Sequence, residues 1–294
     1  MYVIAGATGN TGSRIAEILL QRGKKVRAIG RSKSKLNALK QRGAEIAEGT
    51  LQDKNLLKKT FEGATAAYIL IPPDPTVEKV MAYMDETGEA LTAALKQTKV
   101  PNVVLLSSVG AELPSGTGPI AGLHKQEQRL NQLDSNVLNL RPTFFMENFL
   151  MNIPMIREMG FLGSPAKPDL SMPMIATKDI GTYAAERLDR LDFQDKPVAD
   201  LLGPRDYTHT EVARILGAAI GKPDLPYIQF PYDDAKKGMV QSGLSEEMAD
   251  LYIEMYRAMN DGVIKFQKRN RENTTLTTME QFAAEVFAPA YKHS

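Results

Sequence analysis

The chain begins MYVIAGATGNTGSRIAEILLQRG (residues 1–23), and the glycines of this stretch decide the fold. Gly6, Gly9 and Gly12 separate an uncharged, partly β-branched run from a run whose apolar residues recur at helical spacing. The first run is typical of a strand buried on both faces. Gly23 is a natural helix stop. The stretch therefore predicts a strand, a glycine-rich turn and a helix.

The glycine turn is suited to a bound phosphate. A residue without Cβ can adopt positive φ and lets the backbone approach a bulky group closely. The helix that follows presents free N–H groups and the positive end of its dipole, which favour an anion. A glycine triplet alone also suits any tight turn. With a strand before it and a helix after it, the triplet indicates a dinucleotide-binding site.

The same alternation continues along the first half of the chain. Strands are expected within 24–32, 44–49, 66–73, 100–110 and 136–143, and helices within 33–43, 52–63, 76–99 and 123–134. Strands alternating with helices of this length favour right-handed crossovers and a parallel sheet covered on both faces. The predicted fold class is α/β, a Rossmann-like doubly wound parallel sheet.

Beyond about residue 145 the sequence becomes rich in Met, Pro and Gly. We expect residues 1–150 to form the dinucleotide-binding domain, with one strand near 198–203 returning to its sheet. Residues 151–294 are expected to form a smaller, mixed and mainly helical substrate domain over the carboxyl edge of the sheet. Its helices are predicted within 177–191, 208–223, 245–262 and 277–291.

Composition excludes several classes of protein. The 294 residues contain no cysteine, so disulfides, thiol nucleophiles and thiolate metal sites are excluded, and the three histidines lie far apart. No metal site is expected. The formal net charge of +1 gives no reason to expect nucleic acid or membrane as a partner. With no signal peptide or membrane span apparent, we expect a soluble, cytoplasmic monomer or homodimer.

The end of the second predicted strand indicates which nucleotide binds. Sites for NAD place an acidic residue about 20 positions past the glycines. No Asp or Glu occurs between Glu17 and Glu45, and Arg31 follows the second strand instead. A guanidinium there suits the 2′-phosphate of NADP. The alternative is that Arg31 is an ordinary surface arginine.

Stretches along the whole chain resemble the NmrA-like proteins, which are atypical members of the short-chain dehydrogenase/reductase superfamily. The similar stretches include GATGNTG (6–12), VRAIGRS (26–32), RPTFFMENFL (141–150), MIATKDIG (174–181) and TTLTTMEQFAAEVFAPAY (274–291). The resemblance implies an NADP(H)-binding domain and a cleft beside the smaller domain. By motif position it assigns cofactor contacts to Gly6, Thr8, Gly9, Asn10, Thr11, Gly12, Arg31, Ile71, Pro72, Ser107 and Lys125.

The chain departs from the superfamily at its usual Tyr-x-x-x-Lys pair. Lys125 stands at the lysine position, but Ala121 replaces the tyrosine that serves as general acid. Lys125 is a candidate to bind the ribose or relay a proton, or it lies on a helix surface. His124 and Ser108 are further catalytic candidates, each with a structural alternative: a partly buried histidine and a serine that satisfies backbone at a strand end.

An apolar wall for a flat ligand is predicted near residue 145. Phe145, Met146 and Phe149, with Phe144 beside them, are the candidate substrate-pocket residues, and core packing is the alternative for at least two of the four. Methionines within 245–262 also follow helical spacing. They suit a core stripe or a dimer surface, with an adaptable pocket lid as the alternative.

Three functions remain open at this point. The first is an NADPH-dependent reductase of quinones or similar conjugated molecules, since an acceptor that delocalises charge needs no dedicated tyrosine acid. The second is a non-catalytic NADP(H) sensor, favoured by Ala121. The third is a sugar-nucleotide epimerase or dehydratase, against which the missing tyrosine counts directly.

Overall fold

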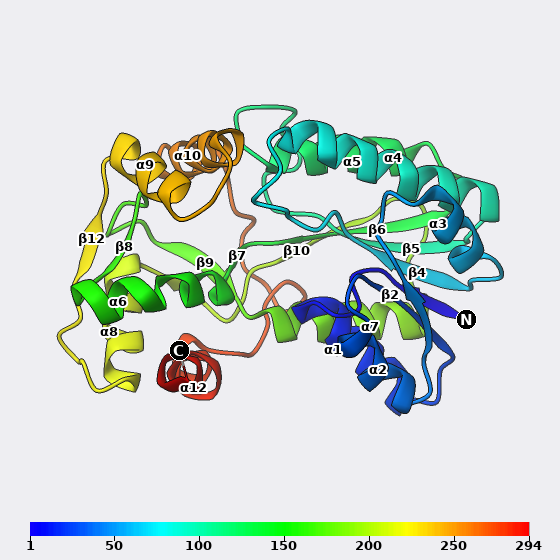
Figure 1. Cartoon of the computed structure of the whole chain (residues 1–294), viewed down its shortest axis with the longest axis horizontal. Coiled ribbons are helices and arrows are strands. Elements are labelled where there is room, and N and C mark those ends of the chain that lie inside the picture. The colour runs from blue at the N-terminus through cyan, green and yellow to red at the C-terminus, as the bar shows by residue number, and fades with distance from the viewer. Residues whose placement is uncertain (294) are drawn as a thin grey trace.

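In the computed structural model, which describes residues 1–293, seven parallel strands form the main sheet in the order β10-β6-β5-β4-β1-β2-β3 (Figure 1). This confirms the predicted Rossmann-like α/β class. Parallel pairing aligns the carboxyl ends of the central strands, since Ile4 pairs with both Ala28 and Tyr68. The strands are β1 (Tyr2–Ile4), β2 (Val26–Gly30), β3 (Glu45–Glu48), β4 (Ala66–Ile69), β5 (Asn102–Leu106), β6 (Asn136–Pro142) and β10 (Val198–Leu201).

Helices cover both faces of the sheet (Figure 1). One face carries α1 (Asn10–Gln21), α2 (Lys33–Gln41) and α7 (Thr177–Arg190), and the other carries α3 (Lys54–Phe61), α4 (Val80–Thr98) and α5 (Ile120–Asn131). Successive strand residues point to opposite faces, so Tyr2 and Ile4 join one core and Val3 joins the other. Because α7 and β10 follow residue 150, the sheet part is built from two separate stretches of chain.

The smaller part surrounds a separate hydrophobic core. Its short strands form a three-stranded and a two-stranded sheet that the sequence pattern did not predict. The strands are β7 (Phe144–Phe145), β9 (Met172–Ile175) and β11 (Asp206–Tyr207), then β8 (Leu162–Ser164) and β12 (Tyr227–Gln229). The helices are the 3₁₀ helix η1 (Met146–Asn152), α6 (Ile153–Met159), α8 (His209–Ala219), α9 (Tyr232–Gln241) and α10 (Glu246–Asn260).

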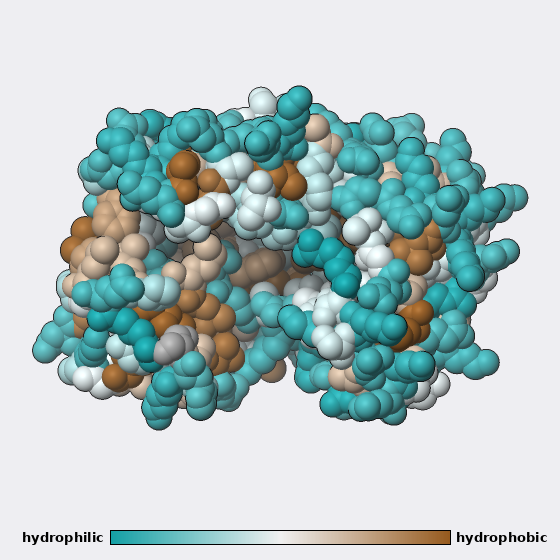
Figure 2. Space-filling view, in the orientation of Figure 1, coloured by the Kyte–Doolittle hydropathy of each residue, from teal (hydrophilic) through white to brown (hydrophobic). Residues whose placement is uncertain are grey.

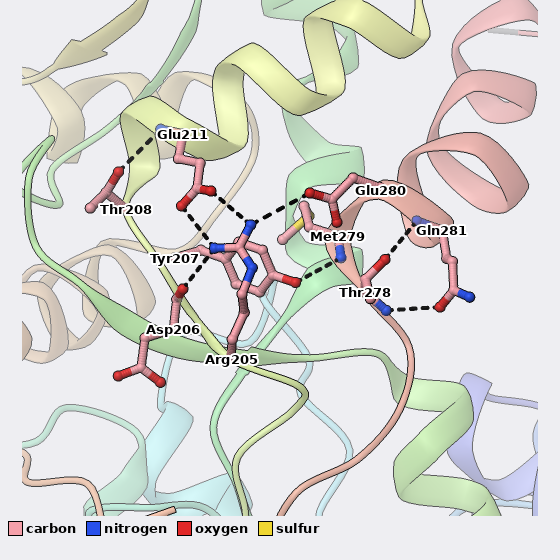
Figure 3. Close-up of polar contacts among 9 residues, drawn as sticks. All are labelled: Arg205, Asp206, Tyr207, Thr208, Glu211, Thr278, Met279, Glu280 and Gln281. Carbon is pink, nitrogen blue, oxygen red and sulfur yellow. Dashed lines mark hydrogen bonds and ion pairs between the residues drawn. The ribbon is translucent and has the colours of Figure 1, made fainter.

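The C-terminal segment is fastened to the smaller part by polar contacts (Figure 3). It comprises α11 (Met279–Phe282), the π-helix η2 (Ala283–Phe287) and α12 (Ala288–His293). The Arg205 guanidinium lies over the Tyr207 ring at 3.9 Å and pairs with Glu211 at 2.7 Å. The Tyr207 hydroxyl accepts a hydrogen bond from the backbone N–H of Met279 at 3.0 Å. These contacts hold the start of α11 against β11 and α8.

His209 is a buried histidine without polar partners. Its side chain lies among the rings of Phe144, Phe149 and Tyr227, and neither ring nitrogen has a hydrogen-bond partner within residues 1–293. Burial disfavours the charged imidazolium and lowers the pKa of His209 to about 4. The ring is therefore neutral in the folded protein at neutral pH.

This burial predicts a loss of stability in mild acid. In the unfolded chain His209 binds a proton near pH 6.5, whereas in the folded protein it does so only near pH 4. Protonation of the unfolded chain therefore lowers the free energy of unfolding as the pH falls from about 6.5 toward 4, and has no effect well above pH 6.5. Between about pH 7.5 and pH 5 we expect the free energy of unfolding to fall by about 2 kcal/mol more in the wild type than in His209→Phe. Urea unfolding at both pH values measures this, and equal losses in the two proteins would contradict it.

Candidate functional site

A cavity of about 820 Å³ lies at the carboxyl ends of the central strands. The loops after β1, β2, β3, β4 and β5 line one part of it, and residues of η1, β7, β9 and α10 line the other. In the space-filling view a hollow with a hydrophobic floor lies between the two halves of the molecule (Figure 2). Ligands of open α/β sheets bind at this edge.

Glycines bring the β1–α1 turn and α1 into close contact. Gly6 has a φ of +62°, and a Cβ there would lie 2.7 Å from the Leu70 side chain. A Cβ on Gly12 would lie 2.4 Å from the carbonyl oxygen of Gly6. A larger residue at position 12 would force the helix and the turn apart. Gly6, Thr8, Gly9, Asn10 and Thr11 line the cavity, whereas Gly12 packs behind them.

The N-terminus of α1 is left open for a ligand. Its N-cap residue is Gly9, no side chain caps the helix, and its first turn carries no acidic residue. The first N–H groups of a helix have no partner within it, so these groups are free to bind an anion. The Thr11 hydroxyl is hydrogen-bonded to the hydroxyl of buried Tyr68 at 2.8 Å, which fixes the side chain under the turn.

Two cations line the cavity after β2. Arg31 and Lys35 both contribute to its wall, with Asp74 from the loop after β4 opposite them. The Arg31 guanidinium lies 3.8 Å from the Asp74 carboxylate. Hydrogen bonds from the Thr76 hydroxyl and backbone N–H lower the pKa of Asp74. The Asp74 carboxylate is therefore ionised at neutral pH, and one anion beside two cations leaves this corner of the cavity with a net positive charge.

A buried polar network supports the end of β5. The Ser107 hydroxyl donates to Glu127 at 2.5 Å, and Arg141 holds the same carboxylate through hydrogen bonds of 2.6 and 2.9 Å. The hydrogen bonds to Glu127 raise the pKa of Arg141. The Ser108 hydroxyl donates to the carbonyl oxygen of Val109 at 2.9 Å. Both serines line the cavity, with their hydroxyl protons committed to protein acceptors.

Lys125 and His124 do not line the cavity. The Lys125 ammonium forms an ion pair with Asp85 of α4 at 3.0 Å, and its side chain is about half exposed. The His124 ring is hydrogen-bonded through Nδ1 to the carbonyl oxygen of Ala111 at 2.8 Å. The structure therefore does not bring these two predicted catalytic residues to the other predicted site residues. Ile71 and Pro72 do lie in the cavity wall.

The part of the cavity away from the charged corner is apolar. Phe144 and Phe145 of β7 line it, whereas Met146 and Phe149 are buried in the core of the smaller part. Of the four residues predicted to form an apolar wall, two therefore line the cavity and two pack in the core. The opposite wall includes three methionines of α10 at helical spacing, Met248, Met255 and Met259. A flat conjugated molecule fits such a wall of aromatic and thioether side chains.

Several lining residues were not predicted. Gly49, Thr50, Leu51 and Gln52 come from the loop after β3. Because β3 pairs with β2 in parallel, the carboxyl ends of both strands lie at the same edge of the sheet. Ligands of open α/β sheets bind at that edge, so the strand prediction was sufficient to place this loop in the site. Tyr83 and Tyr252 also line the cavity and carry no motif that marks them, and Asn148, which lies within RPTFFMENFL (141–150), lines it too. Within residues 1–293 no cluster of three or more potential metal ligands occurs.

Comparisons with known proteins agree with this architecture. The model of the NmrA-like family matches residues 2–283. An NAD(P)H azoreductase from Xenophilus azovorans is 27% identical over 87% of this chain and 86% of its own. Similar solved structures include Citrobacter sp. triphenylmethane reductase complexed with NADP(H), with TM-score 0.81, 19% identity and 97% and 99% of the two chains covered.

An NADPH-dependent quinone oxidoreductase from Escherichia coli, complexed with NADPH, is also similar in structure. The TM-score is 0.77 at 20% identity, and the match covers 100% of this chain and 99% of the other. At these identities the structural likeness shows the fold alone. No helix within residues 1–293 has the length and apolar character that crossing a bilayer requires.

Proposed function

Because this chain belongs to the NmrA-like family, we propose that it is an NADPH-dependent reductase that acts on a quinone or similar conjugated small molecule. The observation that carries the proposal is one continuous cavity that combines four features. A glycine turn and an open helix N-terminus lie beside a cationic corner, and an aromatic wall faces α10. The names of the azoreductase, dye reductase and quinone reductase relatives support the same class of acceptor.

The residues present fit NADPH. The close contact of Gly6 and Gly12 leaves no room for a Cβ, and the uncapped N-terminus of α1 offers N–H groups for a pyrophosphate. Arg31 and Lys35 supply two positive charges for the 2′-phosphate. Ile71, Pro72 and Ser107 line the wall where the nicotinamide half would lie. NADPH, when bound, supplies a hydride.

The residues that line the apolar part of the cavity would orient the acceptor against the cofactor and limit its contact with water. Phe145 and the α10 methionines would hold a flat acceptor against the cofactor site, and their apolar side chains would displace water from the face of the acceptor that they cover. The hydroxyl protons of Ser107 and Ser108 are already committed, so each offers only acceptor lone pairs to a ligand. The proposal assigns no step to Lys125 or His124, which lie outside the cavity wall.

A second candidate function is a non-catalytic NADP(H) sensor. Ala121 removes the usual tyrosine acid, and Lys125 is paired with Asp85 away from the cavity. Such a protein would bind NADPH without turnover. The aromatic and methionine lining beyond the cofactor half favours the reductase, because a sensor needs only the cofactor half.

Oxidation of NADPH in the presence of candidate acceptors tests the proposal. We would follow nicotinamide absorbance with menadione and other quinones, azo dyes such as methyl red, and enones, each against a control without protein. Saturable oxidation by a quinone or azo acceptor is the expected result. NADPH binding without turnover of any acceptor would favour the sensor, and absence of NADPH binding would contradict both functions.

A further inference from the structure

The aromatic part of the cavity contains one phenol without a partner, that of Tyr252 on α10. Within residues 1–293 no hydrogen bond to its hydroxyl occurs, although the side chain is only partly exposed. Its ring packs in a cluster with Ile71, Val80 and Met248, beside the loop after β4. An unpaired, half-buried donor at a cavity wall is free to bind a polar atom of a ligand.

The other hydroxyls that line the cavity are aliphatic, apart from that of Tyr83, and aliphatic hydroxyls are poor proton donors. The Thr143 hydroxyl is buried and unpaired, but an aliphatic hydroxyl holds its proton far more strongly than a phenol. The Asn148 amide can donate a hydrogen bond but does not release a proton at neutral pH. Four more hydroxyls donate to protein acceptors, namely those of Ser107, Ser108, Tyr83 and Thr177.

The charged side chains that follow β2 have another role in the proposed function. Arg31 and Lys35 line the cavity, and Arg31 pairs with Asp74 at 3.8 Å. Both are assigned to the 2′-phosphate of the cofactor and not to proton transfer. Tyr252 is thus the acidic hydroxyl of the aromatic part.

We propose that Tyr252 is a catalytic residue that donates a proton to the substrate oxygen during reduction, in place of the tyrosine missing at position 121. The inference rests on the proposed function. Hydride transfer adds two electrons and one hydrogen to a quinone and leaves negative charge on oxygen. The phenolic O–H bond of Tyr252 breaks as the O–H bond of the hydroquinone forms, and the tyrosinate then takes a proton from water.

The fold fixes the helix that carries this phenol. Gly118, in the loop before α5, has a φ of +62°, and a Cβ there would lie 2.0 Å from the carbonyl oxygen of Leu251. The Glu247 carboxylate accepts hydrogen bonds from the backbone N–H groups of Val80 and Met81, at 2.9 and 3.4 Å. The first half of α10 is therefore held against both the β5–α5 loop and the start of α4.

The surroundings keep Tyr252 protonated before the reaction. Burial disfavours the phenolate and raises the pKa of Tyr252. The side chain therefore holds its proton across the neutral range and can donate it to a ligand. Proton release then depends on negative charge that develops on the substrate.

Tyr252→Phe tests the proposal, with Tyr256→Phe as its matched control. Tyr256 lies one turn further along α10 and packs against the core of the smaller part rather than lining the cavity. With NADPH and menadione we expect Tyr252→Phe to lower kcat about 10- to 100-fold while KM changes less than about threefold. Tyr256→Phe should retain wild-type kcat. Thermal unfolding and NADPH titration confirm that both variants are folded.

Infrared difference spectroscopy of bound menadione gives a readout independent of turnover. A hydrogen bond from Tyr252 lowers a carbonyl stretching frequency, so the frequency should rise in Tyr252→Phe and stay unchanged in Tyr256→Phe. Wild-type kcat in Tyr252→Phe, or a change in KM alone, would overturn the proposal. A wild type that binds menadione with the Tyr252-dependent shift but does not oxidise NADPH would overturn the reductase while keeping the contact. Absence of menadione binding would overturn both.

Discussion

Replacing Arg31 by alanine is expected to weaken NADPH binding by about 10- to 100-fold while leaving NADH binding nearly unchanged. The guanidinium lines the cavity beside Lys35 and is about two-thirds exposed, so it is free to turn toward a phosphate. A charge-assisted hydrogen bond contributes about 1.5–3 kcal/mol, which corresponds to this range. NADH has no 2′-phosphate and loses no such contact. Titration calorimetry with both cofactors measures the difference.

Lys33→Ala is the matched control for this prediction. It removes the same charge from the same segment, but Lys33 is exposed and does not line the cavity. It should leave both affinities within about twofold of wild type, because an exposed charge outside the site is screened by salt. Equal losses of NADPH and NADH affinity in Arg31→Ala would show that Arg31 does not bind the 2′-phosphate.

Gly12→Ala is expected to abolish tight cofactor binding and to destabilise the fold. The new methyl group would lie 2.4 Å from the Gly6 carbonyl oxygen and 2.8 Å from its carbonyl carbon. Both are backbone atoms, so α1 and the turn must separate. Overpacking of this kind costs about 1–3 kcal/mol of stability. We expect NADPH affinity to fall at least about tenfold, because the N–H groups of α1 leave their positions around the pyrophosphate.

Gly238→Ala provides the comparison. Gly238 lies within helix α9, and a Cβ there meets no atom within 4 Å. Alanine is favoured over glycine in a helix by about 1 kcal/mol. This variant should therefore be as stable as wild type or slightly more so, with unchanged cofactor affinity. If Gly12→Ala behaves like Gly238→Ala in urea unfolding and in NADPH titration, the close contact is not required.

The fold of the sheet part could be predicted because its signals are local. Each of β1, β2 and β3 is followed by a helix that begins three to six positions further on, and glycines such as Gly23 and Gly43 follow the helices where the pattern stops. The smaller part lacks such signals. Strands β7 and β11 have two residues each, too few to show alternation, and they are held by pairing with β9.

The sequence determines at which edge of the sheet a residue lies, but not the direction in which its side chain points. The position of Arg31 after β2 follows from the strand order, because a strand end determines the edge on which a residue lies. The direction of Lys125 depends on Asp85, 40 residues earlier on α4, and no spacing rule relates the two. Met146 and Phe149 show why an apolar run does not reveal which of its members face a cavity. Tyr252 carries no motif, and only packing places it there.

Binding of NADPH in this cavity is the property of the wild-type protein on which the proposed function and the role of Tyr252 both depend. Titration calorimetry of the purified protein with NADPH and with NADH measures it. We expect one NADPH bound per chain, with an affinity about 10- to 100-fold higher than that for NADH. Absence of saturable NADPH binding, or equal affinities for the two cofactors, would contradict it.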